Sequence, residues 1–356
     1  MKEKIGVIFG GRSAEHEVSI ESAKTVVKNL SLAGYAVSPI YIPRRGAWRR
    51  VAPAALAGGR LAGTDMEPSF GKESFMLAGR PFRLDAVFPL VHGSTGEDGI
   101  LQGFLELLDL PYVGSGVLAS AAGMDKALSK DIARKSGIPL LPHVEISGRD
   151  KKSVAAALKA ARRLGLPLFV KPAQLGSSVG ITKVKAFNDL ARAVAFAFQY
   201  DWRVLIEKGV DRAREIVCGA LGSPLDARAS VCGEVRPKGR HEFYDYEAKY
   251  LDDNGIDFLA PAPLSVKTAG RLRALSVAIF KALGCCGMAR VDFLMEPGSE
   301  DRFYFCEINT IPGFTSHSLY PTLWKKTGLD PVKLSHRLVR LAIERQKAKS
   351  RLQTVR

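Results

Sequence analysis

The sequence has few cysteines, and they form no recognisable pattern. The five thiols are scattered and odd in number, and none belongs to a CxxC pair: Cys218, Cys232, Cys285, Cys286 and Cys306. Such a set fits reduced, mostly buried and inert thiols better than a disulfide framework or a zinc site. The six histidines also lack metal-ligand spacing, so we expect no transition-metal centre.

Long apolar runs are also missing. No segment approaches the roughly 18 to 20 apolar residues that a membrane helix requires. The start, MKEKIGVIFGG, has a charged beginning and a brief apolar run, but Gly10 and Gly11 end this run too early for a secretory signal. We therefore expect no membrane association and a cytoplasmic location.

Positive charge is plentiful, with a formal net charge of +16. A basic surface can indicate a nucleic-acid partner. Here part of the excess lies in the final segment ERQKAKSRLQTVR and part in PRRGAWRR near residue 45, and neither has the repeated aromatic side chains of a stacking platform. We predict no nucleic-acid binding, because basic charge can serve solubility or attract anionic substrates.

The 356 residues, of which 46% are hydrophobic, predict an α/β protein of two or three domains. A strand over 4–9, a helix over 14–30 and a strand over 36–42 form a βαβ start, which favours a parallel sheet. Residues 44–80 have poor periodicity and are interpreted as an elaborated surface insert. Helices are expected over 125–136, 151–164, 266–283 and 331–347. The predicted units are an N-terminal α/β domain over 1–125, a central unit over 126–210 and a C-terminal unit over 211–356.

Oxygen ligands gather on two strand-like runs near the C-terminus. Alternation places Arg290 and Asp292 on one face of the first run, and Glu307 and Asn309 on one face of the second. Two carboxylates and an amide oxygen suit Mg²⁺ or Mn²⁺, with phosphate oxygens completing the shell. ATP is the expected partner. Arg290 could simply neutralise Asp292, but we favour a role in stabilising an oxyanion or a transferring phosphoryl group.

A second cation lies at the end of the strand LFVKP. Lys171 precedes the loop AQLGSSVG, in which Ser177, Ser178 and the glycines offer hydroxyl and N–H groups to phosphate oxygens. Alone, this loop could equally be an ordinary glycine turn, because GSSVG matches neither the P-loop nor GxGxxG. Further along, Glu207 in LIEK and then Glu215 could bond an adenine amino group or ribose hydroxyls, or form surface salt bridges.

Three polar residues follow strands of the first domain. Glu15 lies where a strand feeds a helix, the usual crevice for ligands in open α/β sheets, and could accept bonds from a substrate ammonium. A glutamate there is also favoured by the helix dipole alone. His92 and Glu97, in HGSTGEDG, could face the same crevice, although a histidine at a strand end is more often structural.

A series of motifs spans almost the whole chain, in this order: GGRSAEHEVSIESA, HGSTGEDGILQGFLELLDLPYVGSG, MDK, VKPAQLGSSVG, LIEK, YDYEAKY, RVDF and CEINTIPGFTSHSL. Together they resemble the D-alanine–D-alanine ligases of the ATP-grasp superfamily. The resemblance implies an α/β ATP-grasp fold, in which an N-terminal parallel-sheet domain is joined to two α+β domains that enclose ATP. The insert over 44–80 is the main departure, and it touches no matched motif.

The resemblance also implies roles in nucleotide binding. It implies that the phosphates contact Lys126, Lys171, Ser178 and Lys249. The hinge beside the adenine would consist of Glu207, Lys208 and Val210, and the ribose would bond Glu215. Two Mg²⁺ or Mn²⁺ ions would be held by Asp292, Glu307 and Asn309.

For the substrates, the resemblance implies that Glu15 and His92 meet the ammonium of the first D-alanine, whose carboxylate attacks the γ-phosphate to give an acylphosphate. Ser318 and the Leu319 backbone would hold the carboxylate of the second D-alanine. Arg290 and the loop containing Gly313 would stabilise the tetrahedral oxyanion.

A hydrogen-bonded triad of Glu15, Ser177 and Tyr250 is implied as well, and it would tie two loops over the reactants to exclude water. The loop YDYEAKY favours D-alanine as the nucleophile.

The expected function is therefore the ATP-dependent synthesis of D-alanyl-D-alanine by a homodimer. The product would supply peptidoglycan precursors, and hence the cell wall and cell shape. A ligase making D-Ala–D-Ser or D-Ala–D-Lac is the alternative with the same fold. A nucleotide-binding regulator without turnover is the alternative of a different class, and the intact acidic residues and Arg290 count against it.

Overall fold

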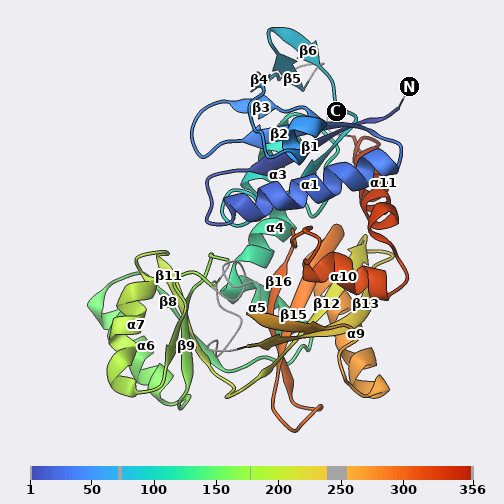
Figure 1. Cartoon of the computed structure of the whole chain (residues 1–356). Coiled ribbons are helices and arrows are strands. Elements are labelled where there is room, and N and C mark those ends of the chain that lie inside the picture. The colour runs from blue at the N-terminus through green and yellow to red at the C-terminus, as the bar shows by residue number, and fades with distance from the viewer. Residues whose placement is uncertain (1, 71–73, 177, 239–254, 354–356) are drawn as a thin grey trace.

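The computed structural model describes residues 2–70, 74–176, 178–238 and 255–353. Their strands form three sheets, one above and two below in Figure 1. Among these residues, no helix combines the length and apolar character needed to cross a membrane.

The first sheet is built around a parallel core. β1 (Lys4–Gly10) pairs in parallel with β2 (Ala36–Ile42) and with β7 (Ala86–Pro89). The crossover between β1 and β2 is α1 (His16–Leu32), whose Val26, Val27 and Leu30 are buried in the core cluster that includes this sheet. The predicted βαβ start is confirmed.

Residues 44–80 do not form a mere surface insert, so that interpretation was wrong in this respect. They contain β3 (Trp48–Arg50), α2 (Pro53–Ala57), β4 (Thr64–Pro68), β5 (Phe75–Leu77) and the start of β6 (Arg80–Phe82). The strands extend the first sheet in the order β6-β5-β4-β3-β2-β1-β7, with antiparallel pairing from β2 outward. Met66 and Phe75 are buried, and Trp48 contacts the Phe104 ring edge-on at 5.2 Å between ring centroids.

The second sheet is antiparallel, in the order β10-β9-β11-β8. Its strands are β8 (His143–Ser147), β9 (Leu168–Pro172), β10 (Thr182–Val184) and β11 (Arg203–Lys208). The helices α6 (Lys151–Arg162) and α7 (Leu190–Ala197), the latter preceded by the 3₁₀ turn η1 (Phe187–Asp189), cover one face. Side chains on the other face line a pocket between this sheet and the third sheet.

The third sheet is also antiparallel, in the order β14-β13-β12-β15-β16. Its strands are β12 (Arg214–Gly222), β13 (Arg228–Pro237), β14 (Ile256–Leu259), β15 (Gly287–Met295) and β16 (Phe303–Asn309). The helix α9 (Val266–Ala282) buries Leu272, Ile279 and Phe280 in the core of this sheet.

The segment joining the first two sheets is helical. It comprises α3 (Ile100–Leu107), α4 (Val117–Met124) and α5 (Lys126–Lys135). Asp125 caps α5 by accepting hydrogen bonds from Ala127 N and Leu128 N, which satisfies backbone donors that have no partner within the helix.

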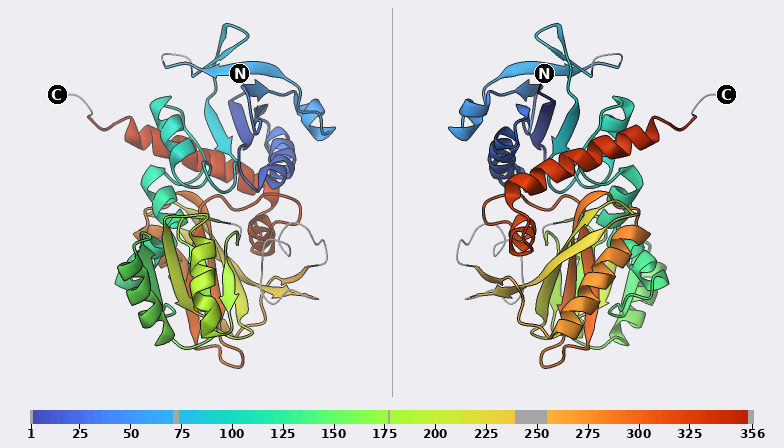
Figure 2. Two further views of the ribbon diagram at one scale, coloured as in Figure 1. Left: turned by 90° about the vertical axis from the view of Figure 1, so that its left-hand side faces the viewer. Right: turned by 90° about the vertical axis from the view of Figure 1, so that its right-hand side faces the viewer.

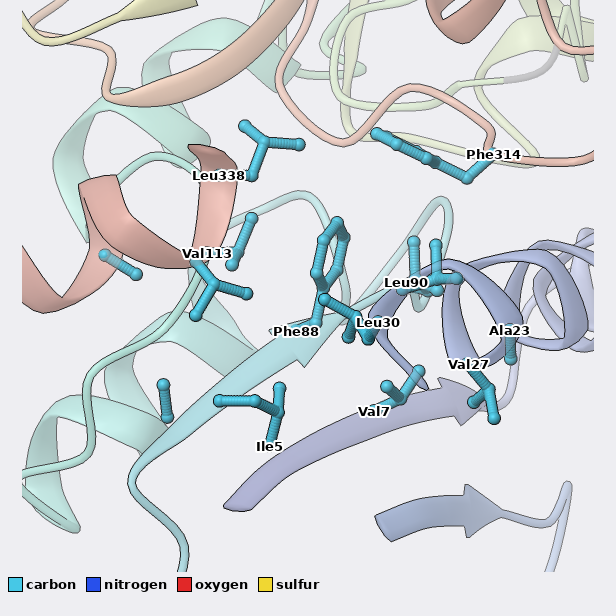
Figure 3. Packing of buried hydrophobic residues seen from close by; sticks show 14 of the residues in the cluster. Ile5, Val7, Ala23, Val27, Leu30, Phe88, Leu90, Val113, Phe314 and Leu338 are labelled. Atoms are coloured by element: carbon cyan, nitrogen blue, oxygen red, sulfur yellow. The ribbon is translucent and has the colours of Figure 1, made fainter. Parts of the chain in front are cut away.

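The C-terminal helices return to the first sheet. After α10 (Leu319–Lys326), the long helix α11 (Pro331–Lys349) runs beneath this sheet and beside α1 (Figure 2). Leu338 of α11 faces a cluster that includes Leu30 of α1 and Phe88 of β7 (Figure 3). The predicted final helix is confirmed, and one core joins residues from both ends of the chain.

Candidate active site

A pocket lies between the second and third sheets. It is lined by side chains from β9, β11, β12, β15 and β16, together with α5 and the loop after β9. Nine residues singled out from the sequence are brought together there: Lys126, Lys171, Ser178, Glu207, Lys208, Val210, Glu215, Asp292 and Glu307.

The predicted oxygen ligands meet across β15 and β16. Asp292 is paired with Glu307 and Arg290 with Asn309, so all four lie on one side of this strand pair. Asp292 and Glu307 side chains are 17% and 28% exposed, which leaves their oxygens accessible from the pocket.

A β-bulge makes this arrangement possible. The register shifts between Asp292 and Phe293, so that Cys306 is the extra residue on β16. Strict alternation would have put Phe305 on the same face as Glu307. Because of the bulge, Phe305 is buried in the core while Cys306 and Glu307 line the pocket.

Basic side chains neutralise these carboxylates. Arg290 donates from Nε and Nη2 to the two oxygens of Asp292, at 2.8 and 2.7 Å. Lys126 Nζ lies 3.3 Å from Glu307 Oε2. The Asn309 amide oxygen accepts a hydrogen bond from Ile311 N at 2.9 Å.

The donor set suits a hard divalent cation. Two carboxylates and an amide oxygen on one strand face can supply part of an oxygen shell that phosphate oxygens complete. Within the described ranges, the structure contains no group of three or more His, Cys, Asp or Glu side chains arranged to hold a metal.

A buried carboxylate forms the back of the pocket. Glu207 is 1% exposed, and its two oxygens lie 2.7 Å from Lys171 Nζ and 2.6 Å from Lys130 Nζ. Burial would raise the pKa of Glu207, but the charges of Lys130 and Lys171 lower it to about 2. For Lys171, burial lowers the pKa, yet Glu207 and the neighbouring Cys306 and Glu307 raise it overall. Both groups are therefore charged at neutral pH.

The loop after β9 is held close to α5. Lys126 N donates to Ala173 O at 2.9 Å, and Lys126 Nζ donates to Leu175 O at 2.7 Å. Ser178 and Gly180 adopt positive φ angles of 58° and 74°. Ser178 of the predicted phosphate loop lines the pocket together with Lys126 and Lys171, while Ser177 lies outside the described residues.

The predicted hinge lies at the end of β11 and just beyond it. Lys208 Nζ donates to Leu166 O, and Lys208, Val210 and Glu215 all line the pocket. Two further residues were not singled out from the sequence: Lys130, which contacts Glu207, and Cys306, which lines the pocket beside Glu307. Burial raises the pKa of the Cys306 thiol to about 11, although Lys171 acts in the opposite sense.

A second polar group lies outside the lining of this pocket, between the first sheet and the loop after β16. His92 Nδ1 is 3.0 Å from Ile311 O and 3.6 Å from Glu97 Oε1, and both side chains are buried. Burial lowers the pKa of His92, but Glu97 and Glu15 raise it overall. A Cβ on Gly93 would lie 2.9 Å from Glu15 Oε2, so the Glu15 carboxylate rests against this turn.

The loop after β16 reaches the same region. Phe314 N donates to Ser22 Oγ at 3.1 Å, and Ser22 Oγ is 3.3 Å from His92 Nε2. Ser318 Oγ accepts a hydrogen bond from Thr315 N at 2.9 Å. Leu319 is 6% exposed and belongs to a hydrophobic cluster, so its side chain packs in the core and only its backbone could bind a substrate.

The structure thus divides the predicted residues into three groups. Arg290 and Asn309 lie beside the pocket ligands on β15 and β16, whereas Glu15 and His92 lie at the junction with the first sheet. Ser318 and Leu319 lie at the start of α10, where Leu319 packs against the third sheet. Lys249 and Tyr250 lie outside the described residues, so their predicted roles stay predictions.

Two antiparallel sheets enclose a pocket lined by lysines and carboxylates, and they are joined to a separate sheet with a parallel core. This architecture defines an ATP-grasp ligase. The family model described as D-ala D-ala ligase N-terminus matches residues 4–115, and the one described as D-ala D-ala ligase C-terminus matches 132–340. The chain therefore belongs to the D-alanine–D-alanine ligase family, whose members are enzymes that use ATP.

Individual relatives agree with this assignment. A D-alanine–D-alanine ligase of Thermoanaerobacter sp. (strain X514) is 42% identical over 98% of this chain and 99% of its own. The solved D-alanine-D-alanine ligase from Coxiella burnetii has a TM-score of 0.87 and 36% identity, covering 98% of this chain and 96% of that one. The VanG D-Ala:D-Ser ligase from Enterococcus faecalis has a TM-score of 0.85 and 34% identity, covering 96% of this chain and 100% of that one.

Proposed function

We propose that this enzyme joins two D-alanines to D-alanyl-D-alanine through an acylphosphate, releasing ADP and phosphate. The observation that carries the proposal is the convergence of Lys126, Lys171, Asp292 and Glu307 on one pocket between two sheets. Cations and cation-binding oxygens in one enclosed site are what phosphoryl transfer requires, because its catalysis consists mainly of positioning and charge stabilisation.

Asp292, Glu307 and Asn309 would hold two Mg²⁺ or Mn²⁺ ions. When bound, the ions offset negative charge on the triphosphate and on the attacking carboxylate. The same face carries Arg290, and Lys126 lies against Glu307, so positive side chains are already placed where this charge would accumulate.

The nucleotide would lie along the pocket. Lys126, Lys171 and Ser178 bind its phosphates. Lys249, which is also predicted to contact the phosphates, lies outside the described residues. Glu207, Lys208 and Val210 form the hinge beside the adenine, and Glu215 on β12 bonds the ribose. Phe169 and Ile181 also line the pocket, and their apolar side chains suit a flat base.

The first D-alanine would bind at the junction with the first sheet. Glu15 accepts from its ammonium group, with His92 nearby, and its carboxylate points toward the γ-phosphate. A carboxylate oxygen attacks the γ-phosphorus, the bond to ADP breaks, and an acylphosphate forms.

The second D-alanine would bind with its carboxylate at Ser318 and the Leu319 N–H. Its neutral amine attacks the acyl carbon, and phosphate leaves from the tetrahedral intermediate. Arg290 and backbone N–H groups near Gly313 stabilise the oxyanion. Because Arg290 is bonded to Asp292 in the structure, we infer that it exchanges this partner during the reaction.

The triad of Glu15, Ser177 and Tyr250 would close the loops over the acylphosphate and exclude water. Ser177 and Tyr250 lie outside the described residues, so support for the triad comes from Glu15 alone, which lies at the turn of Gly93.

In the cell, the product would serve peptidoglycan synthesis, and we propose a cytoplasmic homodimer built from units at 1–125, 126–210 and 211–356. A D-Ala–D-Ser ligase is a second candidate, because the solved D-Ala:D-Ser ligase covers 96% of the chain at 34% identity. A D-Ala–D-Lac ligase is a third possibility with the same fold.

The deciding experiment measures phosphate release from ATP with and without D-alanine and Mg²⁺, and then identifies the products formed with competing D-alanine, D-serine and D-lactate across pH. We expect release to require both D-alanine and Mg²⁺, and D-alanyl-D-alanine to form increasingly as pH rises, because an amine nucleophile must be neutral. ATP binding without D-alanine-stimulated release would indicate a regulator instead. Predominant D-Ala–D-Ser or D-Ala–D-Lac would assign the second or third candidate.

A further inference from the structure

Lys130 occupies an unusual position behind the nucleotide pocket. It lies on α5 and is 0% exposed, and its Nζ is 2.6 Å from Glu207 Oε1 and 3.3 Å from Phe305 O. It is not among the residues that line the pocket. Lys130 therefore cannot touch a nucleotide, and the reaction proposed above gives it no role.

Lys130 changes the charge of the pocket wall. Lys171 and Glu207 are bonded at 2.7 Å and both line the pocket. Alone, this pair would be neutral. With Lys130 on the second Glu207 oxygen, two ammonium groups share one carboxylate, so the Lys130–Glu207–Lys171 cluster carries a net charge of +1.

Burial makes this charge effective. Glu207 and Lys171 are 1% and 7% exposed, so little water separates the cluster from the pocket, and charges interact more strongly there than in bulk water. Holding an unbalanced ammonium away from water is costly, although Lys130 also lowers the pKa of Glu207 and so stabilises its charged form.

We propose that Lys130 adds positive charge to the pocket wall and so helps the pocket to favour the phosphate-bearing form of the nucleotide over its uncharged nucleoside. The inference rests on the proposed function, in which Lys171 faces the phosphates. Lys130 acts through the electric field of its ammonium group, because Glu207 separates it from the pocket. Lys171 is the residue that contacts the phosphates.

The test compares binding of ATP, ADP and adenosine by isothermal titration calorimetry, at constant Mg²⁺, in the wild-type enzyme and in Lys130→Met. Removing one buried charge should weaken ATP binding about tenfold, ADP binding less, and adenosine binding by less than about twofold. A purely structural change in the pocket would weaken all three ligands alike. Lys135→Met, which alters an exposed lysine on the same helix, is the matched control and should leave every affinity unchanged.

Glu207→Gln and the double variant Lys130→Met/Glu207→Gln complete the cycle. The double variant again carries the wild-type net charge, so its ATP-to-adenosine affinity ratio should return to the wild-type value. Relative to Glu207→Gln alone, the added Lys130→Met substitution should lower this ratio by about the same tenfold factor. This comparison also decides the matter if Lys130→Met alone does not fold.

An unchanged ratio in folded Lys130→Met overturns the inference. So does a double variant that behaves like Glu207→Gln, because Lys130 would then act only by positioning Glu207. Both results leave the proposed function intact, whereas a wild-type enzyme that binds no ATP would refute the proposed function itself.

Discussion

At the scale of single residues, the site consists of oppositely charged side chains in contact with one another. Asp292 is bonded to Arg290, Glu307 lies 3.3 Å from Lys126, and Glu207 is shared by two lysines. The metal ligands and Lys171 could be predicted, because alternation along short strands reveals which side chains share a face. The role of Lys130 could not be predicted, because the sequence of α5 does not reveal that this face of the helix packs against β16.

Glu307→Gln should abolish turnover, since it removes a negative charge from the proposed cation site while preserving volume. We expect at least about a hundredfold loss of kcat and a stability change below about 1 kcal/mol, because the side chain is 28% exposed and its ion pair with Lys126 is partly solvated. Glu296→Gln, on the same hairpin and paired with Arg302 at 3.0 Å, is the control and should keep full activity. Wild-type kcat in Glu307→Gln would refute the metal assignment.

Glu207 should also make stability depend on pH. Its pKa is about 2 in the folded protein against an ordinary value of 4.5, so the stabilisation from its ion pairs is present above pH 4.5 and is lost as pH falls toward 2. Urea unfolding of the wild type and Glu207→Gln at pH 7, 4.5 and 3 should show a difference on the order of 3 kcal/mol that shrinks at the lowest pH. A difference that stays constant would contradict the charged state of Glu207.

At the scale of elements, strand ends and turns decide where the side chains point. The long helices were predictable because they have an apolar stripe and a recognisable start, as at the Asp125 cap of α5. The strands β3, β5 and β6 have three residues each, too few for alternation to stand out, which is why 44–80 was interpreted as an insert. The bulge at Cys306 could not be predicted from the sequence either, because no local pattern of residues marks the extra residue in a strand.

The turn at Gly93 offers a test of the substrate-binding junction. Gly93 has φ of 71°, and a Cβ there would lie 2.9 Å from Glu15 Oε2. Gly93→Ala should therefore displace the Glu15 carboxylate and raise the KM for D-alanine about tenfold, with little change in ATP affinity.

Gly34→Ala is its matched control. Gly34 has φ of 93° but open space around it, so this variant carries only the backbone strain of roughly 1 kcal/mol. If both variants lose stability alike and neither changes the KM for D-alanine, Glu15 does not bind the first substrate.

At the scale of the whole molecule, one core joins the two ends of the chain. Leu334, Leu338 and Val339 of α11 are buried in the same cluster as Val26 and Leu30 of α1. The amphipathic pattern predicted that α11 exists, but a single sequence contains no signal for its partner at the other end of the chain. The pairing places the loop after β16 against His92 and so completes the proposed substrate site.

Leu338→Ala should therefore destabilise the enzyme by about 2 to 5 kcal/mol, the usual cost of an emptied leucine site in a packed core. The exposed Lys333→Ala on the same helix, whose side chain is 78% exposed, should change stability by less than about 0.5 kcal/mol. Equal unfolding curves for the two variants would mean that α11 does not support the first sheet.

The path of oxygen tests the central claim most directly, because carboxylate activation moves an atom that can be followed. D-Alanine labelled with ¹⁸O in its carboxylate is incubated with ATP, Mg²⁺ and the enzyme, and the phosphate and dipeptide are examined by mass spectrometry. If the carboxylate attacks the γ-phosphorus in the pocket of Lys126, Lys171, Asp292 and Glu307, one labelled oxygen should appear in each phosphate released. Phosphate without label, formed alongside dipeptide, would contradict the acylphosphate and the account built on it.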